Sequence, residues 1–533
     1  MGAGYTGKLL FVDLSAKTIE TRRIDGAVYR RYLGGSGLGV KLLTELGDPT
    51  TDSLDRKNPL IFAPGLLTGT LVPGATRTSL VAKSPLTGIF GEASVGGTWG
   101  AECRFTGLDA IVVTGAAREP VYLWIQSHTA EIRPAGHLWG KDTFETSTAV
   151  RAETDPEARV GCIGPAGEAL SRIAAVVFEG ELARVAGRTG MGAVMGSKRL
   201  KAVAVKGSQG LRIAEPKRLL DWGAPVHKDL EAKFGLFTRY GTTGSLEMHE
   251  ERGALGIKNF SSGDFKAQAP RISGKAIHQH YPHKQSSCSG CPVHCWVVVK
   301  EKDGGGTHGR GPEYETLGSL GAMLMIDDLD AVVRANELAN RLGLDTISLG
   351  NTIAFAVEAF ERGLIDERQT GGLTLKWGDP KGLLALIEKV GKREGIGGLL
   401  ADGSRAAART LGRGAEALTV EVKGLELPMH DPRAFWSSAL NYACGSRGAC
   451  HLDAIAFAVE SGVRIPEFGY NSKLSPYSTE GKAVLVKRMH DLMGVYNATG
   501  MCKFYLRAVG GPVWLAEAIN MVTGWGISSE ELM

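Results

Sequence analysis

Residues 288–295 read CSGCPVHC and place three of the chain's eight cysteines in one short stretch. The spacing CxxCxxxC, with Pro292 between the second and third thiols, brings three thiolates to one small loop and suits three corners of a cuboidal iron–sulfur cluster. The fourth ligand has to come from elsewhere, so the loop predicts that a distant segment folds back onto it. Spacing does not choose among the other cysteines, which are Cys103, Cys162, Cys444, Cys450 and Cys502.

A zinc site is the alternative for the same thiols. Zinc usually takes a second CxxC or a histidine pair at conventional spacing, and neither stands out here. His294 and the run HQHYPH at residues 278–283 adjoin the loop. Histidines beside such loops are more often exposed or hydrogen-bonded than ligating, so we leave them out of the predicted ligand set.

The bulk composition narrows the setting. A chain of 533 residues with 43% hydrophobic content can form roughly three domains. Its 61 basic and 57 acidic side chains give a formal net charge of +4, which argues against a nucleic-acid or membrane-surface partner. No apolar run approaches the roughly 18 residues that span a bilayer. The irregular cysteines indicate metal or redox use in a reducing compartment, so we expect a cytoplasmic protein without a signal peptide.

Glycine is the compositional outlier, since its 73 residues are about twice the usual share of ~7%. Two glycine-rich segments also carry arginines: GATRTSLVAKSPLTGIFGEASVGGTWG and RVAGRTGMGAVMGSK. Exposed backbone N–H groups and guanidinium groups are a common means of holding phosphates and polar heterocycles. Neither segment meets the P-loop pattern, and GGSGLG is not a proper GxGxxG, so nucleotide binding is weakly supported.

The pattern along the chain changes character near residue 208. Residues 8–24 predict a β-hairpin, and four further runs (109–115, 120–126, 130–136 and 200–207) predict strands bounded by turn formers. From about residue 211 apolar residues recur at helical spacing, with a break between two helices at Gly343. A short strand-like piece at 419–427 interrupts the helices. We predict domains at 1–208, 209–418 and 419–533.

Two segments share the form N-x-x-G-apolar-(D or C) at the ends of predicted helices: 340–345 (NRLGLD) and 497–502 (NATGMC). Glycine at this position fits a helix C-cap, and Asp345 would cap the helix that follows. The repeated terminus predicts a pair of amide-rich cradles, which suits a ligand with two similar halves.

Taken together, these motifs resemble the aldehyde:ferredoxin oxidoreductase family of tungsten, less often molybdenum, bis-pterin enzymes. The resemblance runs over nearly the whole chain, through YTGKLLFVDLS, YLGGSGLG, RTSLVAKSPLTG, AGRTGMGAVMGSKRLKAVAV, CSGCPVHC, GPEYETLGSLG, GLDTIS, RGACH and the last GMC. It implies an α+β fold, with an N-terminal β-rich domain followed by two mainly helical domains and the cofactor at their interface.

The resemblance also implies which residues hold the cofactors. Cys288, Cys291, Cys295 and, from the C-terminal domain, Cys502 would bind a 4Fe-4S cluster. Contacts to pterin or phosphate, with a magnesium ion bridging the phosphates, would come from Arg77, Ser94, Gly96, Arg184, Val185, Gly187 and Arg188. The cradles would each hold one pterin, through Asn340, Leu344 and Asp345 and through Asn497, Met501 and Cys502, with Arg447 as another contact.

This sequence departs from the family pattern at four places. Asn340 and Asn497 stand where aspartate is usual, Ser94 where asparagine is common, and Asp453 where a basic residue can occur. Asparagine still hydrogen-bonds a pterin but brings no charge. We expect cofactor binding to survive, while the sequence does not choose between tungsten and molybdenum.

The implied reaction is oxidation of a small aldehyde to its acid, with electrons passing through the cluster to ferredoxin or an electron-transfer subunit. The family's base falls on Glu315 in PEYET, and its hydrogen-bonding histidine falls on His451 in RGACH. Glu313 is the second choice for the base. Without the resemblance, Glu315 reads as a surface or capping residue and His451 as a core histidine.

Two other functions remain open on the sequence. The chain could be the catalytic tungstopterin subunit of a larger complex that acts on another substrate, such as an aromatic thioester. It could also be a noncatalytic iron–sulfur electron carrier, which would bind iron without tungsten or pterin. For assembly we expect a homo-oligomer or a subunit of a hetero-complex.

Overall fold

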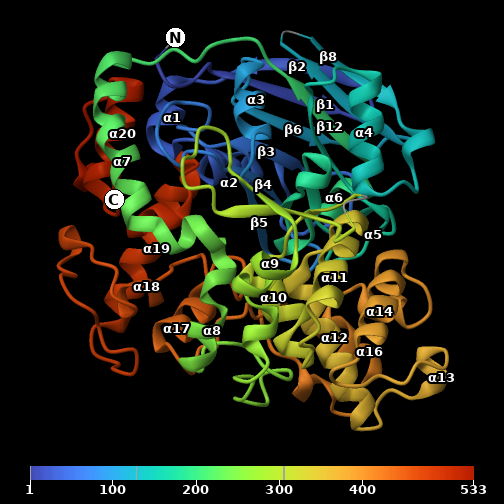
Figure 1. Cartoon of the computed structure of the whole chain (residues 1–533). Coiled ribbons are helices and arrows are strands. Elements are labelled where there is room, and N and C mark those ends of the chain that lie inside the picture. The colour runs from blue at the N-terminus through green and yellow to red at the C-terminus, as the bar shows by residue number, and fades with distance from the viewer. Residues whose placement is uncertain (1, 128, 304–305) are drawn as a thin grey trace.

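A computed structural model describes residues 2–127, 129–303 and 306–533. Its upper part in Figure 1 is β-rich and its lower part is mainly helical. One mixed sheet has the order β2-β1-β6-β3-β4-β5. Its strands are β1 (Lys8–Asp13), β2 (Thr18–Arg23), β3 (Leu60–Pro64), β4 (Thr78–Lys83), β5 (Phe90–Val95) and β6 (Ala110–Thr114). The predicted hairpin is confirmed, because β1 and β2 pair antiparallel from Lys8↔Arg23 to Asp13↔Thr18.

Another mixed sheet has the order β11-β10-β9-β12-β7-β8. Its strands are β7 (Val121–Gln126), β8 (Thr129–Pro134), β9 (Arg159–Cys162), β10 (Val176–Phe178), β11 (Arg184–Ala186) and β12 (Leu200–Lys206). The strands predicted at 109–115, 120–126, 130–136 and 200–207 are therefore confirmed as β6, β7, β8 and β12.

Trp99 joins the two sheets. It begins α3 (Trp99–Phe105), is 1% exposed, and its ring centroid lies 5.8 Å from that of Phe62 in β3 and 5.3 Å from that of Phe178 in β10. Its indole N–H donates to the Val203 carbonyl in β12 at 3.1 Å. A buried indole needs such a partner, so this contact fixes how the sheets pack. Other helices of this part are α1 (Gly26–Tyr32), α2 (Gly35–Leu46), α4 (Thr143–Glu153), α5 (Pro165–Glu168) and α6 (Met191–Ser197).

The middle of the chain is mainly helical. Its helices include α7 (Pro216–Tyr240), α8 (Leu246–Glu251), α9 (Gly274–His280), α10 (Tyr314–Leu320), α11 (Leu329–Leu342), α12 (Thr346–Glu361), α13 (Glu367–Thr370), α14 (Pro380–Lys392), α15 (Ile396–Leu400) and α16 (Ser404–Leu411). Gly343 ends α11 in the left-handed region at φ 75°, and Asp345 then caps α12 by accepting from the N–H groups of Ile347 and Ser348. The predicted break at Gly343 is confirmed.

The sequence did not predict a small sheet in this helical region, formed by β13 (His283–Ser286), β14 (Trp296–Lys300) and β15 (Thr307–Arg310). The first two strands pair antiparallel, with Ser286 opposite Trp296. The cysteine-rich segment is the loop of this hairpin, so the sheet fixes both of its ends.

The C-terminal part starts with the strand-like piece at 419–427, which is the hairpin β16 (Glu421–Val422) and β17 (Leu425–Glu426). Its helices are α17 (Trp436–Cys444), α18 (Phe457–Glu460), α19 (Lys482–Thr499), α20 (Pro512–Thr523) and α21 (Ser529–Leu532). Helix α7 packs beside α20, and Phe234 of α7 belongs to the same buried core as residues of α19 and α20 (Figure 1). The divisions at 208 and 418 stay a prediction.

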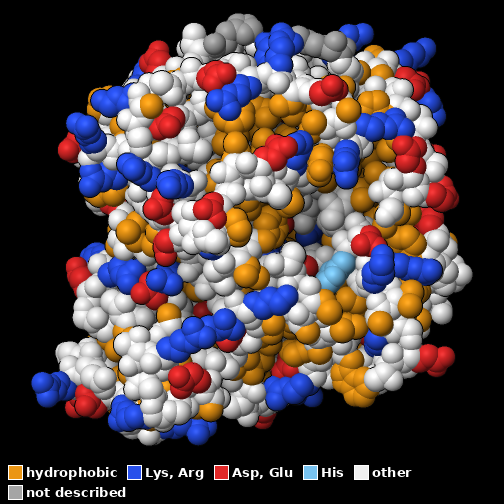
Figure 2. All heavy atoms as spheres, turned by 180° about the vertical axis from the view of Figure 1, so that it is seen from behind, with side chains coloured by type: hydrophobic (Ala, Val, Ile, Leu, Met, Phe, Trp, Pro, Cys, Tyr) orange, Lys and Arg blue, Asp and Glu red, His pale blue; other side chains and the backbone are white. Residues whose placement is uncertain are grey.

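The fold class is confirmed as an N-terminal β-rich part followed by mainly helical parts. Charged side chains of both signs are interspersed over the face in Figure 2, as the small net charge leads one to expect. Among the residues that the structure describes, none of the helices combines the length and the apolar character needed to cross a membrane.

Glycine residues let the C-terminal part touch the N-terminal part backbone to backbone. A Cβ on Gly65 would lie 2.1 Å from the Gly500 nitrogen. Next to this contact, the Leu67 N–H donates to the Thr499 carbonyl at 2.9 Å, and the Arg77 N–H donates to the Gly500 carbonyl at 2.9 Å. Ala75 and Met501 also form an isolated antiparallel β-bridge. The atoms that an added Cβ on Gly65 would meet belong to the backbone of Thr499 and Gly500. They cannot move aside as the end of a flexible side chain would.

We predict that Gly65→Ala lowers the apparent Tm, because overpacking against backbone costs about 1–3 kcal/mol. Gly494→Ala is the matched control: Gly494 lies inside α19 with no atom within 4 Å of its added Cβ. Alanine there gains roughly 0.8–1.0 kcal/mol of helix propensity. Thermal unfolding of both variants and the parent checks this, and an unchanged Tm for Gly65→Ala would contradict the close approach.

Candidate active site and cluster loop

The structure brings the four predicted cluster cysteines to one place. The Cys502 thiol lies 3.5 Å from an Arg77 guanidinium nitrogen, and a Cβ on Gly96 would lie 3.0 Å from the Cys288 sulfur. On the other side of the loop, the Cys291 sulfur is 3.4 Å from the Tyr505 hydroxyl, in the short helix (Lys503–Arg507) that follows Cys502. The distant segment that the loop requires is therefore the C-terminal one.

The thiols are not gathered as closely as the ligands of one zinc ion would be. All eight cysteines are free, and two thiolates on one tetrahedral zinc ion lie about 3.8 Å apart, given a Zn–S bond of ~2.3 Å. Within the described residues, no three of the four sulfurs lie within 4.8 Å of one another.

Arginines surround the thiol group. The Arg184 and Arg310 guanidinium carbons lie 5.2 and 5.3 Å from the centroid of the Trp296 ring, beside the loop. Burial alone would raise the pKa of Cys288, but Arg184 and Arg77 hold that pKa below its usual value. Burial raises the pKa of Cys291 to about 11. The positive charges suit a group that brings negative charge to the sulfurs.

The first cradle lies against the β-rich part. The Arg188 Nε is 3.5 Å from the Asp345 carboxylate, and a Cβ on Gly187 would lie 3.2 Å from the same carboxylate. Leu344 forms an isolated antiparallel β-bridge with Ala174. The Asn340 carbonyl accepts a hydrogen bond from the Thr143 hydroxyl at 2.8 Å. Val185 lies in β11, shortly before Gly187 and Arg188 in the sequence. The predicted residues Arg188, Gly187 and Asp345 are therefore neighbours in space.

The second cradle is joined to the arginine region by Glu92, which the sequence analysis missed. The Asn497 amide donates to the Glu92 carboxylate at 3.2 Å, and Arg447 donates to the Glu92 carbonyl at 2.5 Å. Arg447 also lies 3.1 Å from Asp453. Ser94 pairs with Ser79 across β4 and β5, and the Ser79 hydroxyl donates to Glu92 at 2.8 Å. Because Glu92 stands in an apolar strand pattern, no motif marks it.

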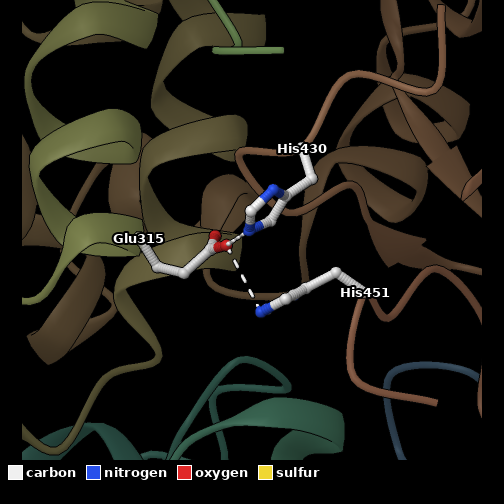
Figure 3. A group of neighbouring side chains, drawn as sticks. All are labelled: Glu315, His430 and His451. Carbon is white, nitrogen blue, oxygen red and sulfur yellow. Dashed lines mark ion pairs between the residues drawn. The ribbon is translucent and has the colours of Figure 1, made fainter. Parts of the chain in front are cut away.

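Glu315, His430 and His451 form a close group where three segments meet (Figure 3). Glu315 lies in the first turn of α10, whereas the two histidines come from loops after β17 and α17. One Glu315 carboxylate oxygen is 3.3 Å from His430 Nε2 and 3.5 Å from His451 Nε2. The other oxygen accepts the Met429 N–H at 2.8 Å. His430 is a lone histidine in LPMHDP, and sequence reasoning missed it.

Aromatic contacts hold His430 in place. Its ring centroid lies 4.6 Å from that of His451, 4.8 Å from that of His249 and 4.9 Å from that of Phe457. His430 therefore cannot turn away from Glu315 without disturbing three packed rings.

Burial and the neighbouring polar groups set the protonation states of Glu315 and His451. Burial alone would raise the pKa of Glu315, but His451, His430 and the Met429 N–H lower that pKa to about 2. Burial lowers the pKa of His451 to about 3, against the opposing effect of Glu315. At neutral pH the site thus holds an ionised carboxylate beside a neutral His451 imidazole.

Glu313, the second choice for the base, does not belong to this group. Its carboxylate contacts the Arg310 guanidinium and the Thr242 hydroxyl. Glu313 directly precedes α10 as its N-cap residue, so it points to a different place from Glu315.

The Glu315 group is also a poor fit to a dedicated metal site. Metal-bound imidazoles usually donate from their second ring nitrogen to a carboxylate or carbonyl. The Nδ1 atoms of both His430 and His451 are buried without a hydrogen-bond partner. The site therefore suits hydrogen bonding and proton transfer.

Several buried polar atoms fit a large polar ligand. Arg184 Nε and Nη1, Arg188 Nε and Ser348 Oγ are buried without a hydrogen-bond partner. Buried polar groups are otherwise almost always paired, so these atoms match a ligand with acceptor groups, as a pterin phosphate has. Figure 2 shows the surface hollowed where the β-rich and helical parts meet.

Comparison with known proteins agrees with this geometry. The family model "Aldehyde ferredoxin oxidoreductase, N-terminal domain" matches residues 9–207, and the model for domains 2 and 3 of the same family matches residues 225–533. The tungsten-containing aldehyde ferredoxin oxidoreductase of Pyrococcus furiosus is 38% identical, over 99% of this chain and 86% of the relative.

Two other similar proteins have different names. An aliphatic sulfonate oxidoreductase, WOR-like subunit, of Pyrococcus furiosus is 31% identical, over 99% of this chain and 83% of the relative. The solved active site complex BamBC of benzoyl coenzyme A reductase, with 1,5-dienoyl-CoA, superimposes with a TM-score of 0.87 at 26% identity, over 100% of this chain and 87% of that chain. With family models over almost its whole length, the chain belongs to the aldehyde ferredoxin oxidoreductase family, a family of oxidoreductases.

Proposed function

We propose that this protein oxidises an aldehyde to the carboxylic acid with a tungsten bis-pterin cofactor and passes the electrons through a 4Fe-4S cluster to ferredoxin or a similar carrier. The observation that carries the proposal is the meeting of four thiols in a chain 38% identical to a tungsten-containing aldehyde ferredoxin oxidoreductase. A noncatalytic iron–sulfur carrier would not need the buried Glu315 group or the arginine-lined cradles.

The residues that would hold the cofactors are those that the family resemblance implies, and their positions support the assignment. Cys288, Cys291, Cys295 and Cys502 would bind the cluster. Arg184, Arg188 and the cradles at 340–345 and 497–502 would hold the two pterins, with magnesium between their phosphates. When bound, the tungsten–pterin group would take up two electrons together and the cluster would release them singly.

The chain's own residues would manage the protons. Aldehyde and water give the acid, two electrons and two protons, so an acceptor for a proton must stand beside the attacking water. The Glu315 oxygen that faces the two imidazoles would be that acceptor. His451 would donate a hydrogen bond to the carbonyl oxygen as negative charge develops on it.

The low pKa of Glu315 sets a condition on this role. Proton transfer to a carboxylate whose pKa lies well below its usual value is unfavourable at pH 7. The contacts that lower this pKa must therefore be broken during the reaction. Substrate and water entering between Glu315 and the imidazoles would do this and raise the basicity of the carboxylate.

A second candidate is a catalytic subunit of a larger complex with another substrate. Its support is the similarity to a WOR-like subunit named for an aliphatic sulfonate and to a benzoyl coenzyme A reductase complex. An aldehyde panel with an artificial dye, together with identification of co-purifying subunits, separates the two candidates.

We predict that protein purified without oxygen contains tungsten or molybdenum, extractable pterin and roughly four iron atoms per heavy metal. Elemental analysis with pterin extraction measures this. Iron without pterin or heavy metal would favour the noncatalytic carrier.

Cys502→Ala is expected to lose most of the bound iron, because the cluster would lack one of its four thiolates. Cys444→Ala is the matched control, since Cys444 is an exposed free cysteine. Iron analysis and the cluster's electron paramagnetic resonance signal give the result. Equal iron loss in both variants, or in neither, would contradict the assignment of Cys502.

Glu315→Gln should lower kcat by about 10²–10⁴-fold, the usual contribution of a positioned acid or base. Because Glu315 and His451 titrate near pH 2 and 3, neither should produce a transition in kcat/KM between pH 5 and 8. Glu313→Gln should retain more activity. Steady-state kinetics over that pH range test this, and a larger loss in Glu313→Gln would reverse the assignment.

A further inference from the structure

The loop at residues 288–295, called the cluster loop below, reaches the surface, where a partner can approach it. Gly290 and His294 in the loop are exposed, and the four cysteines are partly exposed. Electrons that leave the cluster one at a time have to pass from this loop to an acceptor bound next to it. The surface beside the loop therefore decides which carrier can dock.

Two neighbouring elements extend this surface. The Gln285 amide in β13 donates to the Thr238 carbonyl in α7 at 2.5 Å, and a Cβ on Gly241 would lie 2.1 Å from the Cys295 carbonyl. The end of α7 therefore lies directly against the cluster loop.

The same helix also covers the segment that carries Cys502. The Phe234 ring centroid is 5.9 Å from that of Tyr505, and the Phe237 centroid is 4.7 Å from that of Phe504. Lys233 donates to the Ala508 carbonyl at 3.0 Å.

The exposed surface of α7 near its C-terminal end carries an apolar residue between two cations. Lys233, Leu236 and Arg239 follow one another at three-residue spacing, so they share one face of the helix. All three are exposed, and Leu236 is 78% exposed. Lys284 in β13 is also exposed, and it precedes Gln285, whose amide contacts the end of α7. We call Lys233, Leu236, Arg239, Lys284 and His294 the basic rim.

The charge of this region differs from that of the whole chain. The segments 232–246, 282–300 and 497–516 contain no Asp or Glu, although the whole chain is nearly neutral. Carboxylates approach these segments from outside: Glu313 contacts Thr242, Glu92 contacts Asn497, and Glu467 lies against Gly511. Local positive charge of this kind steers an oppositely charged protein and raises its association rate.

We propose that the basic rim is the docking surface for an acidic one-electron carrier protein. Its cations attract the carrier, and Leu236 supplies an apolar contact at the centre. Each encounter passes one electron to an oxidised carrier, so one aldehyde reduces two carriers. The proposal rests on the proposed function and adds where the carrier binds and which charge it bears.

The test compares two double variants of the holoenzyme. Arg239→Glu with Lys284→Glu reverses the rim. Lys381→Glu with Lys392→Glu makes the same change in charge on α14, which lies on the opposite side of the molecule from α7 in Figure 1. Activity is measured with a purified ferredoxin of net negative charge and with a small uncharged quinone.

At low ionic strength, kcat/KM for ferredoxin should fall about tenfold in the rim variant and stay unchanged in the α14 variant. Both variants should keep their activity with the quinone. The parent's activity with ferredoxin should also fall as salt rises to ~0.15 M, because charges are then screened beyond about 8 Å. Equal ferredoxin activity in the two variants would overturn the proposal.

A binding titration separates this proposal from the proposed function. Calorimetry of ferredoxin with each holoenzyme needs no turnover, and the rim variant should bind about tenfold more weakly. If the parent oxidises no aldehyde with the quinone, the proposed function fails, while the titration still decides the docking surface. Equal affinity of the two variants would exclude the rim.

Discussion

The structure depends on the return of the C-terminal segment to the glycine-rich strands at the start of the chain. That contact is made by backbone, with Gly65 against Gly500 and Ala75 beside Met501. It ends α19 at Gly500 and sets Cys502 next to Arg77. Because this contact fixes the position of Cys502, its thiol meets the three thiols of the loop at residues 288–295 without any disulfide.

Buried charge is the second constraint. Arg77, Arg184 and Arg310 lie around the thiols, and Glu315 is an ionised carboxylate among imidazoles. An unpaired buried charge destabilises a fold by several kcal/mol, whereas a bound group that supplies the opposite charge removes this penalty. A negatively charged cofactor is therefore expected to stabilise the protein as well as to supply its chemistry. This explains how the chain tolerates arginine nitrogens without hydrogen-bond partners in its interior.

Much of the local structure could be predicted from the sequence. The β1–β2 hairpin, the break at Gly343 and the glycine end of α19 follow from strand alternation and helix capping, which are local rules. The roles of Glu92 and His430 could not be predicted, because each depends on contacts with residues far away in the chain. The small sheet that carries the cluster loop was missed for the same reason: its strands are short, and their pairing becomes visible only in three dimensions. The proposed catalytic roles of Glu315 and His451 had no local signal and came from the family resemblance alone.

The central claim is that Cys502 completes the ligand set of the three cysteines in the hairpin loop. Anomalous diffraction at the iron absorption edge, from crystals of the holoenzyme grown without oxygen, tests it most directly. The account predicts one compact iron feature bonded to Cys288, Cys291, Cys295 and Cys502, beside the C-terminal end of α7. An iron feature bonded to another cysteine in place of Cys502, or no iron near the loop, would contradict it.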